Sequence, residues 1–173
     1  MYFIEAEGID LTAYYNPDGS FEAIEGTIVG PPTPKAAPRA CKNGHIYNPM
    51  RAKMEATRRV MERALEAEGL IGEGSTLFDN PNTPLKLTAT YYMPRRLDEF
   101  INRDRHNDLK TSSRAAVTVV HVDTDNLTKY LMDIFTSVIY QDDDQVSALN
   151  LTRVLHSEGS CEGKTVFEVK KFN

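Results

Sequence analysis

Residues 121–146 read HVDTDNLTKYLMDIFTSVIYQDDDQV, and this stretch decides how the rest of the chain is interpreted. It holds six aspartates and a single basic residue, Lys129. A β-branched run at 115–122 precedes it, and residues 126–138 place apolar side chains at the spacing of a helix packed on a sheet. We therefore expect a strand, a helix and a second strand that begins at Val146.

Two groups of carboxylates flank the predicted helix. Asp123 and Asp125 end the β-branched run, and alternate side chains of an extended strand point the same way, so both carboxylates can face one point. Asp125 also stands where a helix N-cap is expected. A short strand-helix-strand unit can bring the second group back beside Asp123, and this group comprises Asp142, Asp143 and Asp144. The two groups are expected to form one site.

A divalent cation explains why a fold tolerates so many carboxylates. Like charges a few ångströms apart raise one another's pKa, so the cluster is costly unless a cation neutralises it. Oxygen ligands without Cys or His select Mg²⁺, Mn²⁺ or Ca²⁺. Lys129 falls four residues after Asp125 and four before Asp133, so these three residues form one line on the helix. Metal ions with a nearby lysine are suited to phosphodiester hydrolysis.

Two structural alternatives compete with the metal site. An isolated D-x-D pair is more often a solvated acidic loop beside an ordinary helix cap. An EF-hand calcium loop needs an oxygen ligand at its fifth position and a glycine at its sixth, where this chain has Leu127 and Thr128. The EF-hand is therefore excluded.

The charge of the chain is unevenly distributed. The net charge of −5 argues against nucleic-acid binding, but residues 1–30 contain six acids and no bases, whereas residues 31–63 contain eight bases and two acids. Arg58, Arg59 and Arg63 suit the solvated face of a helix equally well. The preferred candidates for DNA backbone contact are Lys35, Arg39, Lys42, Arg51 and Lys53.

Composition limits the remaining classes of protein. The chain of 173 residues is expected to form one domain with a genuine core. It has neither a signal-peptide pattern nor an apolar run of about eighteen residues, so a cytoplasmic protein without membrane contact is expected. Cys41 and Cys161 are too few for a disulfide framework or a zinc cage, and they are expected to be free thiols.

Hydrophobic periodicity elsewhere predicts a mixed sheet with helices packed on it. Residues 85–91 alternate apolar and polar side chains, the pattern of a strand with one buried face. A helix is expected to start at Pro49 and to stop at Gly69, and Asn43-Gly44 predicts a tight hairpin before it. The expected order is β-hairpin-α-β-β-α-β-β, an α/β fold of the α+β type, with further strands at 23–29, 146–155 and 165–172.

Two segments stand outside this plan. Residues 1–22 form an acidic amino-terminal extension, whose aromatic residues and Pro17-Asp18-Gly19 turn predict a hairpin added to the edge of the sheet. Residues 95–114 mix charges of both signs with few apolar side chains. We interpret them as a mobile polar insertion loop next to the site that folds on DNA.

The acidic stretch resembles the RusA family of Holliday-junction resolvases. The first conserved block, D-x-D-N-L-x-K, is matched by Asp123, Asp125, Asn126, Leu127 and Lys129, and the second, D-D-x-Q-V, by Asp142, Asp143, Gln145 and Val146. Residues 30–39 (GPPTPKAAPR), residues 47–49 and the helix after them resemble the amino-terminal half of the family. The resemblance thus runs from about Gly26 to the end of the chain.

The resemblance implies a RusA-like single domain that acts as an Mg²⁺-dependent DNA endonuclease, with Mn²⁺ able to substitute. Such a homodimer resolves four-way junctions by paired cuts during recombination and repair, in a bacterial or phage-infected cell. By this resemblance Asp123, Asp125 and Asp143 hold the metal and are needed for catalysis, Asp142 is an extra ligand, and Lys129 is the catalytic lysine. His121 and Val122 depart from the family pattern, which often has a basic residue with a proline there.

The sequence leaves other functions open. A related metal-dependent nuclease acting on flaps or forks would have the same acidic residues, because surface shape selects the branched substrate. A non-catalytic junction-binding protein is less favoured, since Lys129 and every matching aspartate are present. The preferred cleavage sequence and the number of metal ions are also left open.

Overall fold

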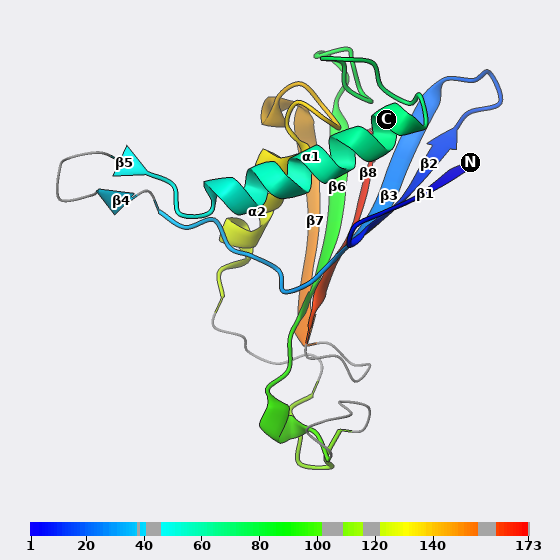
Figure 1. The fold of residues 1–173 in the computed structure, drawn as a ribbon. Helices are drawn as coiled ribbons and strands as arrows, with labels where there is room; N and C mark the ends of the chain where they lie inside the picture. The colour runs from blue at the N-terminus through cyan, green and yellow to red at the C-terminus, as the bar shows by residue number, and fades with distance from the viewer. Residues whose placement is uncertain (38, 41–45, 102–108, 116–121, 156–161, 173) are drawn as a thin grey trace.

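The computed structural model describes residues 1–37, 39–40, 46–101, 109–115, 122–155 and 162–172. Its centre is a six-stranded mixed sheet with the strand order β1-β2-β3-β8-β6-β7, and helix α1 lies across this sheet (Figure 1). The predicted α+β class, with one mixed sheet and two main helices, is confirmed. The six strands are β1 (Tyr2–Ala6), β2 (Ile9–Tyr15), β3 (Phe21–Val29), β6 (Leu85–Met93), β7 (Val146–Leu155) and β8 (Lys164–Lys171).

The β6–β7 pair determines where the acidic stretch lies. These strands are parallel neighbours, whereas β6 is antiparallel to β8 on its other side. A parallel pair needs a crossover connection, and helix α2 (Thr124–Phe135) belongs to this one. The sequence predicted a strand at 115–122 as the first arm of this unit. Residues 116–121 lie outside the described part of the chain, and β6 is the strand that pairs with β7.

One hydrophobic core joins the sheet to both helices. Every second residue of β6 from Leu85 to Met93 is buried, as the alternating sequence predicted. Helix α1 (Arg51–Ala67) and α2 bury their apolar stripes against this face. The stripe of α1 consists of Met54, Met61 and Leu65, and that of α2 includes Leu127, Leu131, Ile134 and Phe135.

The bounds of α2 differ from the prediction at both ends. Asp123, not Asp125, is the N-cap residue, and the helix ends at Phe135 instead of Val138. The C-cap residue Thr136 has an extended ψ of 131°, which ends the helix, and Ser137 after it is left-handed with φ 70°. Val138 is nevertheless fully buried, in the turn after the helix. The apolar sequence pattern extends beyond the end of the helix because the turn that follows also packs into the core.

Residues 1–15 provide two further strands at one edge of the sheet. Strand β1 pairs antiparallel with β2, and β2 pairs with β3, so this hairpin extends the sheet on the side away from β7. A second, two-stranded sheet consists of β4 (Arg39–Ala40) and β5 (Ile46–Tyr47), which flank the predicted Asn43-Gly44 hairpin. That hairpin itself lies outside the described residues.

The described parts of the 95–114 insertion lie beyond one end of the sheet (Figure 1). A short 3₁₀ helix, η1 (Leu97–Glu99), places the Glu99 carboxylate between two guanidinium groups. Arg95 Nη1 donates to Glu99 Oε2 at 2.9 Å, and Arg114 donates to Glu99 Oε1. Phe100 beside them is fully buried. The insertion thus contains a buried ion pair, Arg95–Glu99, and a half-buried one, Arg114–Glu99, which its polar composition did not suggest.

The described helices include none that is both long enough and apolar enough to cross a membrane.

Candidate functional site

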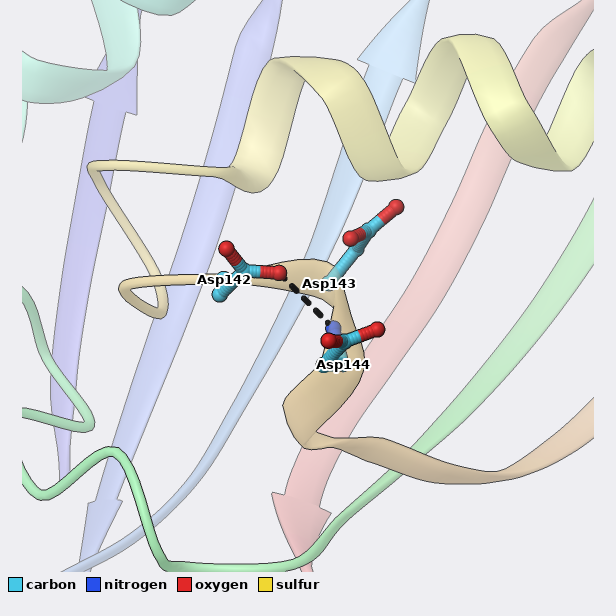
Figure 2. Close-up of side chains that lie close together, drawn as sticks. All are labelled: Asp142, Asp143 and Asp144. Atoms are coloured by element: carbon cyan, nitrogen blue, oxygen red, sulfur yellow. Dashed lines mark hydrogen bonds between the residues drawn. The ribbon is translucent and has the colours of Figure 1, made fainter.

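Three adjacent aspartates gather where the chain enters β7. Asp142 precedes a 3₁₀ turn, η2 (Asp143–Gln145), that contains Asp143 and Asp144. Each of the three can offer one carboxylate oxygen so that these oxygens all lie within 4.8 Å of one another. Asp142 Oδ1 accepts a hydrogen bond from the backbone N–H of Asp144 at 3.1 Å, and Asp143 extends toward α2 (Figure 2). The group is exposed to solvent, so a cation and DNA can reach it.

Mutual repulsion makes this group receptive to positive charge. Side-chain hydrogen bonding with Asp142 raises the pKa of Asp143, and burial and the charges of Asp142, Asp144 and Asp133 raise it further. A hard cation would remove the cause of this shift, since carboxylate oxygens are the ligands that Mg²⁺ prefers. The donor set therefore fits the predicted metal.

Gln145, the polar residue of the second sequence block, holds η2 in place. Its side chain is buried, and its Oε1 accepts from the backbone N–H of Gln141 at 2.9 Å. Its Nε2 donates to the carbonyl of Asn80 at 3.2 Å. Gln141 Nε2 adds a bond to the carbonyl of Asp79 at 2.6 Å. The sequence shows Gln145 beside the aspartates but not that it ties them to a loop before β6.

The first acidic group lies at the start of α2. Asp123 is the N-cap, and Asp125 belongs to the first helical turn. Because the helix begins at Thr124, these carboxylates do not project from one strand, so the predicted same-face arrangement of an extended chain is wrong. The Arg153 guanidinium, from β7, donates to the carbonyl of Val122 and holds the chain just before Asp123. Sequence reasoning did not single out Arg153.

Lys129 lies beside the first group, as its spacing predicted. Its Nζ is 3.0 Å from Asp125 Oδ2, and the two side chains are 59% and 65% exposed. This hydrogen bond is the largest cause of the lowered pKa of Asp125. Both charged groups face solvent, where a DNA phosphate can reach the ammonium.

The two acidic groups do not form one close cluster among the residues that the structure describes. Among the residues that the structure describes, only Asp142, Asp143 and Asp144 come together at 4.8 Å, and Asp123 and Asp125 are not part of that cluster. Asp123 caps α2 and Asp125 lies in its first turn, whereas Asp142, Asp143 and Asp144 follow the end of this 12-residue helix. Asp133 on the third turn is the helical carboxylate whose charge acts on Asp143.

The predicted DNA contacts have distinct surroundings. Arg51 pairs with Glu55 at 2.7 Å, and Lys53 Nζ donates to Thr33 Oγ1 at 2.6 Å. Arg39 is exposed on β4, and Lys42 lies outside the described residues.

Lys35 has a different neighbour from the other predicted DNA contacts, because its Nζ is 2.8 Å from Asp133 Oδ2. The guanidinium of Arg58 donates to the backbone carbonyl of the same aspartate. Two basic residues of the 31–63 block therefore contact α2 directly.

Comparison with known protein families matches residues 29–162 to the family described as endodeoxyribonuclease RusA. A comparison with curated proteins finds no match. The matched segment contains both acidic groups, Lys129 and the basic residues. It starts at the last residue of β3, so the β1–β2 hairpin lies before it.

Proposed function

Because the chain belongs to the RusA endodeoxyribonuclease family, we propose that it resolves Holliday junctions by paired phosphodiester hydrolysis during DNA recombination and repair. The observation that carries the proposal is the exposed carboxylate cluster of Asp142, Asp143 and Asp144, within the segment that matches the family. The domain would span residues 1–173, with residues 1–22 and 95–114 as additions to its common part.

The proposed metal is Mg²⁺, with Mn²⁺ able to substitute. Oxygen-only donors within 4.8 Å of one another support it, as does the repulsion that raises the pKa of Asp143. We assign metal binding to Asp142 and Asp143 from η2 and to Asp123 and Asp125 from the start of α2. In the arrangement described here, each pair would hold an ion of its own. Such an ion, when bound, activates water and stabilises the charge on the leaving oxygen.

Lys129 would supply the positive charge that the protein itself brings to the reaction. In the hydrolysis a water oxygen forms a bond to phosphorus, the bond from phosphorus to one ester oxygen breaks, and that oxygen receives a proton. Negative charge accumulates on the phosphate oxygens meanwhile. An ammonium group held 3.0 Å from Asp125 is placed to stabilise that charge without moving far.

The DNA would approach over the basic block. Arg39, Lys42, Arg51 and Lys53 are proposed to contact backbone phosphates, because this segment carries the excess of basic residues. A homodimer with one site per subunit would match the near two-fold symmetry of a four-way junction. The substrate would place this activity in the cytoplasm of a bacterial or phage-infected cell.

Cleavage of a synthetic mobile four-way junction tests the proposal. The protein is incubated with the junction, a flap, a fork and a plain duplex, each with and without Mg²⁺, and Asp143→Asn serves as the inactive control. Paired nicks in the junction that require Mg²⁺ are expected. Faster cutting of the flap or fork would indicate a nuclease for other branched DNA, and binding without cutting would indicate a junction-binding protein.

A further inference from the structure

Lys35 contacts α2 at two levels. Its backbone N–H donates to the carbonyl of Asn126, in the first turn of the helix, at 2.8 Å. Its Nζ is 2.8 Å from Asp133 Oδ2, in the third turn. The Lys53–Thr33 bond ties the same loop to α1. The loop around Lys35, which the sequence suggested for DNA contact, is therefore bound along the acidic face of α2.

Asp133 is the most sheltered carboxylate on that face. Its side chain is 27% exposed, against 65% for Asp125. Because solvent screens it less, a pair formed at Asp133 is stronger than one formed at Asp125. An unpaired Asp133 would therefore attract any cation within reach.

Lys129 is such a cation. It stands one helical turn after Asp125 and one turn before Asp133, and side chains four residues apart are neighbours on a helix surface. An acid that precedes a lysine by four residues pairs better than one that follows it, so Lys129 prefers Asp125 to Asp133. This preference is smaller than thermal energy. The structure shows Lys129 at Asp125 and Lys35 at Asp133.

We propose that Lys35 is a positioning residue for the nuclease reaction: by neutralising Asp133, it keeps Lys129 at Asp125 instead of at Asp133. Lys129 then stays at the end of α2 that carries Asp123. The proposal rests on the proposed function in one respect, the assignment of Lys129 to the scissile phosphate. In this proposal Lys35 affects the reaction through Asp133 and Lys129, and it does not contact a DNA phosphate.

A double-mutant cycle tests this coupling. Lys35→Met is made in the native protein and in Asp133→Asn, and single-turnover junction cleavage is measured with saturating enzyme and Mg²⁺. Because the substitution frees Asp133 to compete for Lys129, we expect a loss of about fivefold in the native background, the size of coupling typical of neighbouring charges. In the Asp133→Asn background, Lys35→Met is expected to cause no further loss, since no competing carboxylate remains. Lys35→Arg should retain the native rate.

Lys53→Met is the matched control. It removes the other side-chain tie of the same loop without touching Asp133. Its effect on the rate should be the same in both backgrounds. If Lys35 instead contacts phosphate, Lys35→Met will weaken junction binding and lower its salt dependence equally in both backgrounds, with an unchanged rate at saturation. That result would overturn the proposal.

A second measurement decides the partner of Lys129 without any cleavage. Side-chain NMR of the lysine ammonium groups reports whether Lys129 contacts Asp125 or Asp133. The contact should move to Asp133 in Lys35→Met and return to Asp125 in the double variant, with folding checked by thermal unfolding. A Lys129 that stays at Asp125 in Lys35→Met overturns the inference. A native protein that cuts no DNA overturns the proposed function instead.

Discussion

At the scale of single residues, the charged side chains of α2 have partners that differ in exposure. The Lys129–Asp125 pair is open to solvent, so it contributes little to stability. Breaking an exposed ion pair of this kind costs little free energy when a phosphate binds Lys129. The Lys35–Asp133 pair is more sheltered and connects distant parts of the chain.

Lys129→Ala should lose activity without losing the fold. A helix tolerates alanine well, and the broken pair is worth little. Removal of a charge that stabilises the transition state typically costs a factor of about 100 to 1,000 in rate. Single-turnover cleavage and thermal unfolding are measured on the same preparation. Near-normal turnover of a folded variant would reduce Lys129 to a surface ion pair.

Asp123→Asn, Asp125→Asn and Asp143→Asn should each abolish cleavage and leave junction binding intact or tighter. Each change removes a proposed metal ligand and a charge that repels phosphate, so catalysis and affinity should separate. Cleavage is followed in Mg²⁺, and binding is measured in Ca²⁺. Asp10→Asn, on β2, is the comparison, because it removes an equal charge outside both acidic groups. Retained cutting by all three variants would refute the metal assignment.

At the scale of elements, the sheet is stabilised by close packing around a glycine, whereas the insertion is stabilised by ion pairs. Gly26 in β3 lies between Leu11 of β2 and Phe167 of β8, its cross-strand partners. A Cβ at this position would stand 2.6 Å from the Phe167 ring and 2.7 Å from Leu11. The insertion instead depends on the ion pairs of Glu99.

Gly26→Ala should destabilise the protein. The added methyl group would overpack the centre of the sheet, at a cost of about 1–3 kcal/mol. Gly72→Ala is the control, since its Cβ would meet only Ser75 Oγ, at 3.6 Å, and its effect should stay within about 0.5 kcal/mol. Urea unfolding measures both variants. Equal stability of the two would show that β3 can move away from Phe167.

Glu99→Gln should open the insertion at neutral pH. The pKa of Glu99 is lowered to about 2, first by its hydrogen bond with Arg114. Since this pKa lies below the unfolded value, the stabilisation is present above about pH 4.5 and is lost as the pH falls toward 2. Loss of the charge leaves Arg95 buried beside a neutral partner, at a cost of about 3 kcal/mol.

Hydrogen exchange of the Lys110 amide measures this opening, because that N–H donates to the Glu99 carbonyl at 2.9 Å. The difference between native protein and Glu99→Gln should shrink as the pH is lowered. Asp98→Asn, which breaks an exposed pair with Arg96, is the control and should change exchange little. A difference that grows toward low pH would contradict the assigned direction of the Glu99 pKa.

At the scale of the whole molecule, positive and negative charge lie in separate segments. Residues 1–30 are acidic and residues 31–63 basic. Glu5 on β1 and Asp10 on β2 lie toward the sheet edge opposite β7, whereas Glu22 and Glu25 lie on the interior strand β3. The net negative charge of the chain therefore does not describe the basic segment, which is the part proposed to contact DNA.

Arg39→Ala with Lys42→Ala should weaken binding to junction and duplex alike. Each lost phosphate contact lowers the slope of log affinity against log salt by about 0.9 for duplex arms. Fluorescence titrations at several salt concentrations measure the slope, and single-turnover cutting at saturation should change much less. Lys86→Ala, on a central strand, is the control. An unaltered slope of log affinity against log salt would show that the basic residues 31–63 form an ordinary solvated surface.

Much of the fold was determined locally. The alternation of β6, the apolar stripes of both helices and the span of β7 follow from periodicities of two and about 3.6 residues, which each segment carries by itself. The end of α2 was not determined in this way, because Val138 is buried by tertiary packing after the helix has stopped.

For the candidate site, the sequence by itself predicted which residues are candidates for the chemistry. Spacing alone predicts the Lys129–Asp125 pair, since four residues make about one helical turn. The assignment of Asp123, Asp125, Lys129 and Asp143 to the reaction comes from the resemblance to the RusA family. Only the tertiary structure decided that Lys35 pairs with Asp133 and that, among the described residues, the two acidic groups do not form one close cluster. The physical reason is that ion pairs between distant segments depend on how the loop and the helix pack together, and no local periodicity encodes that packing.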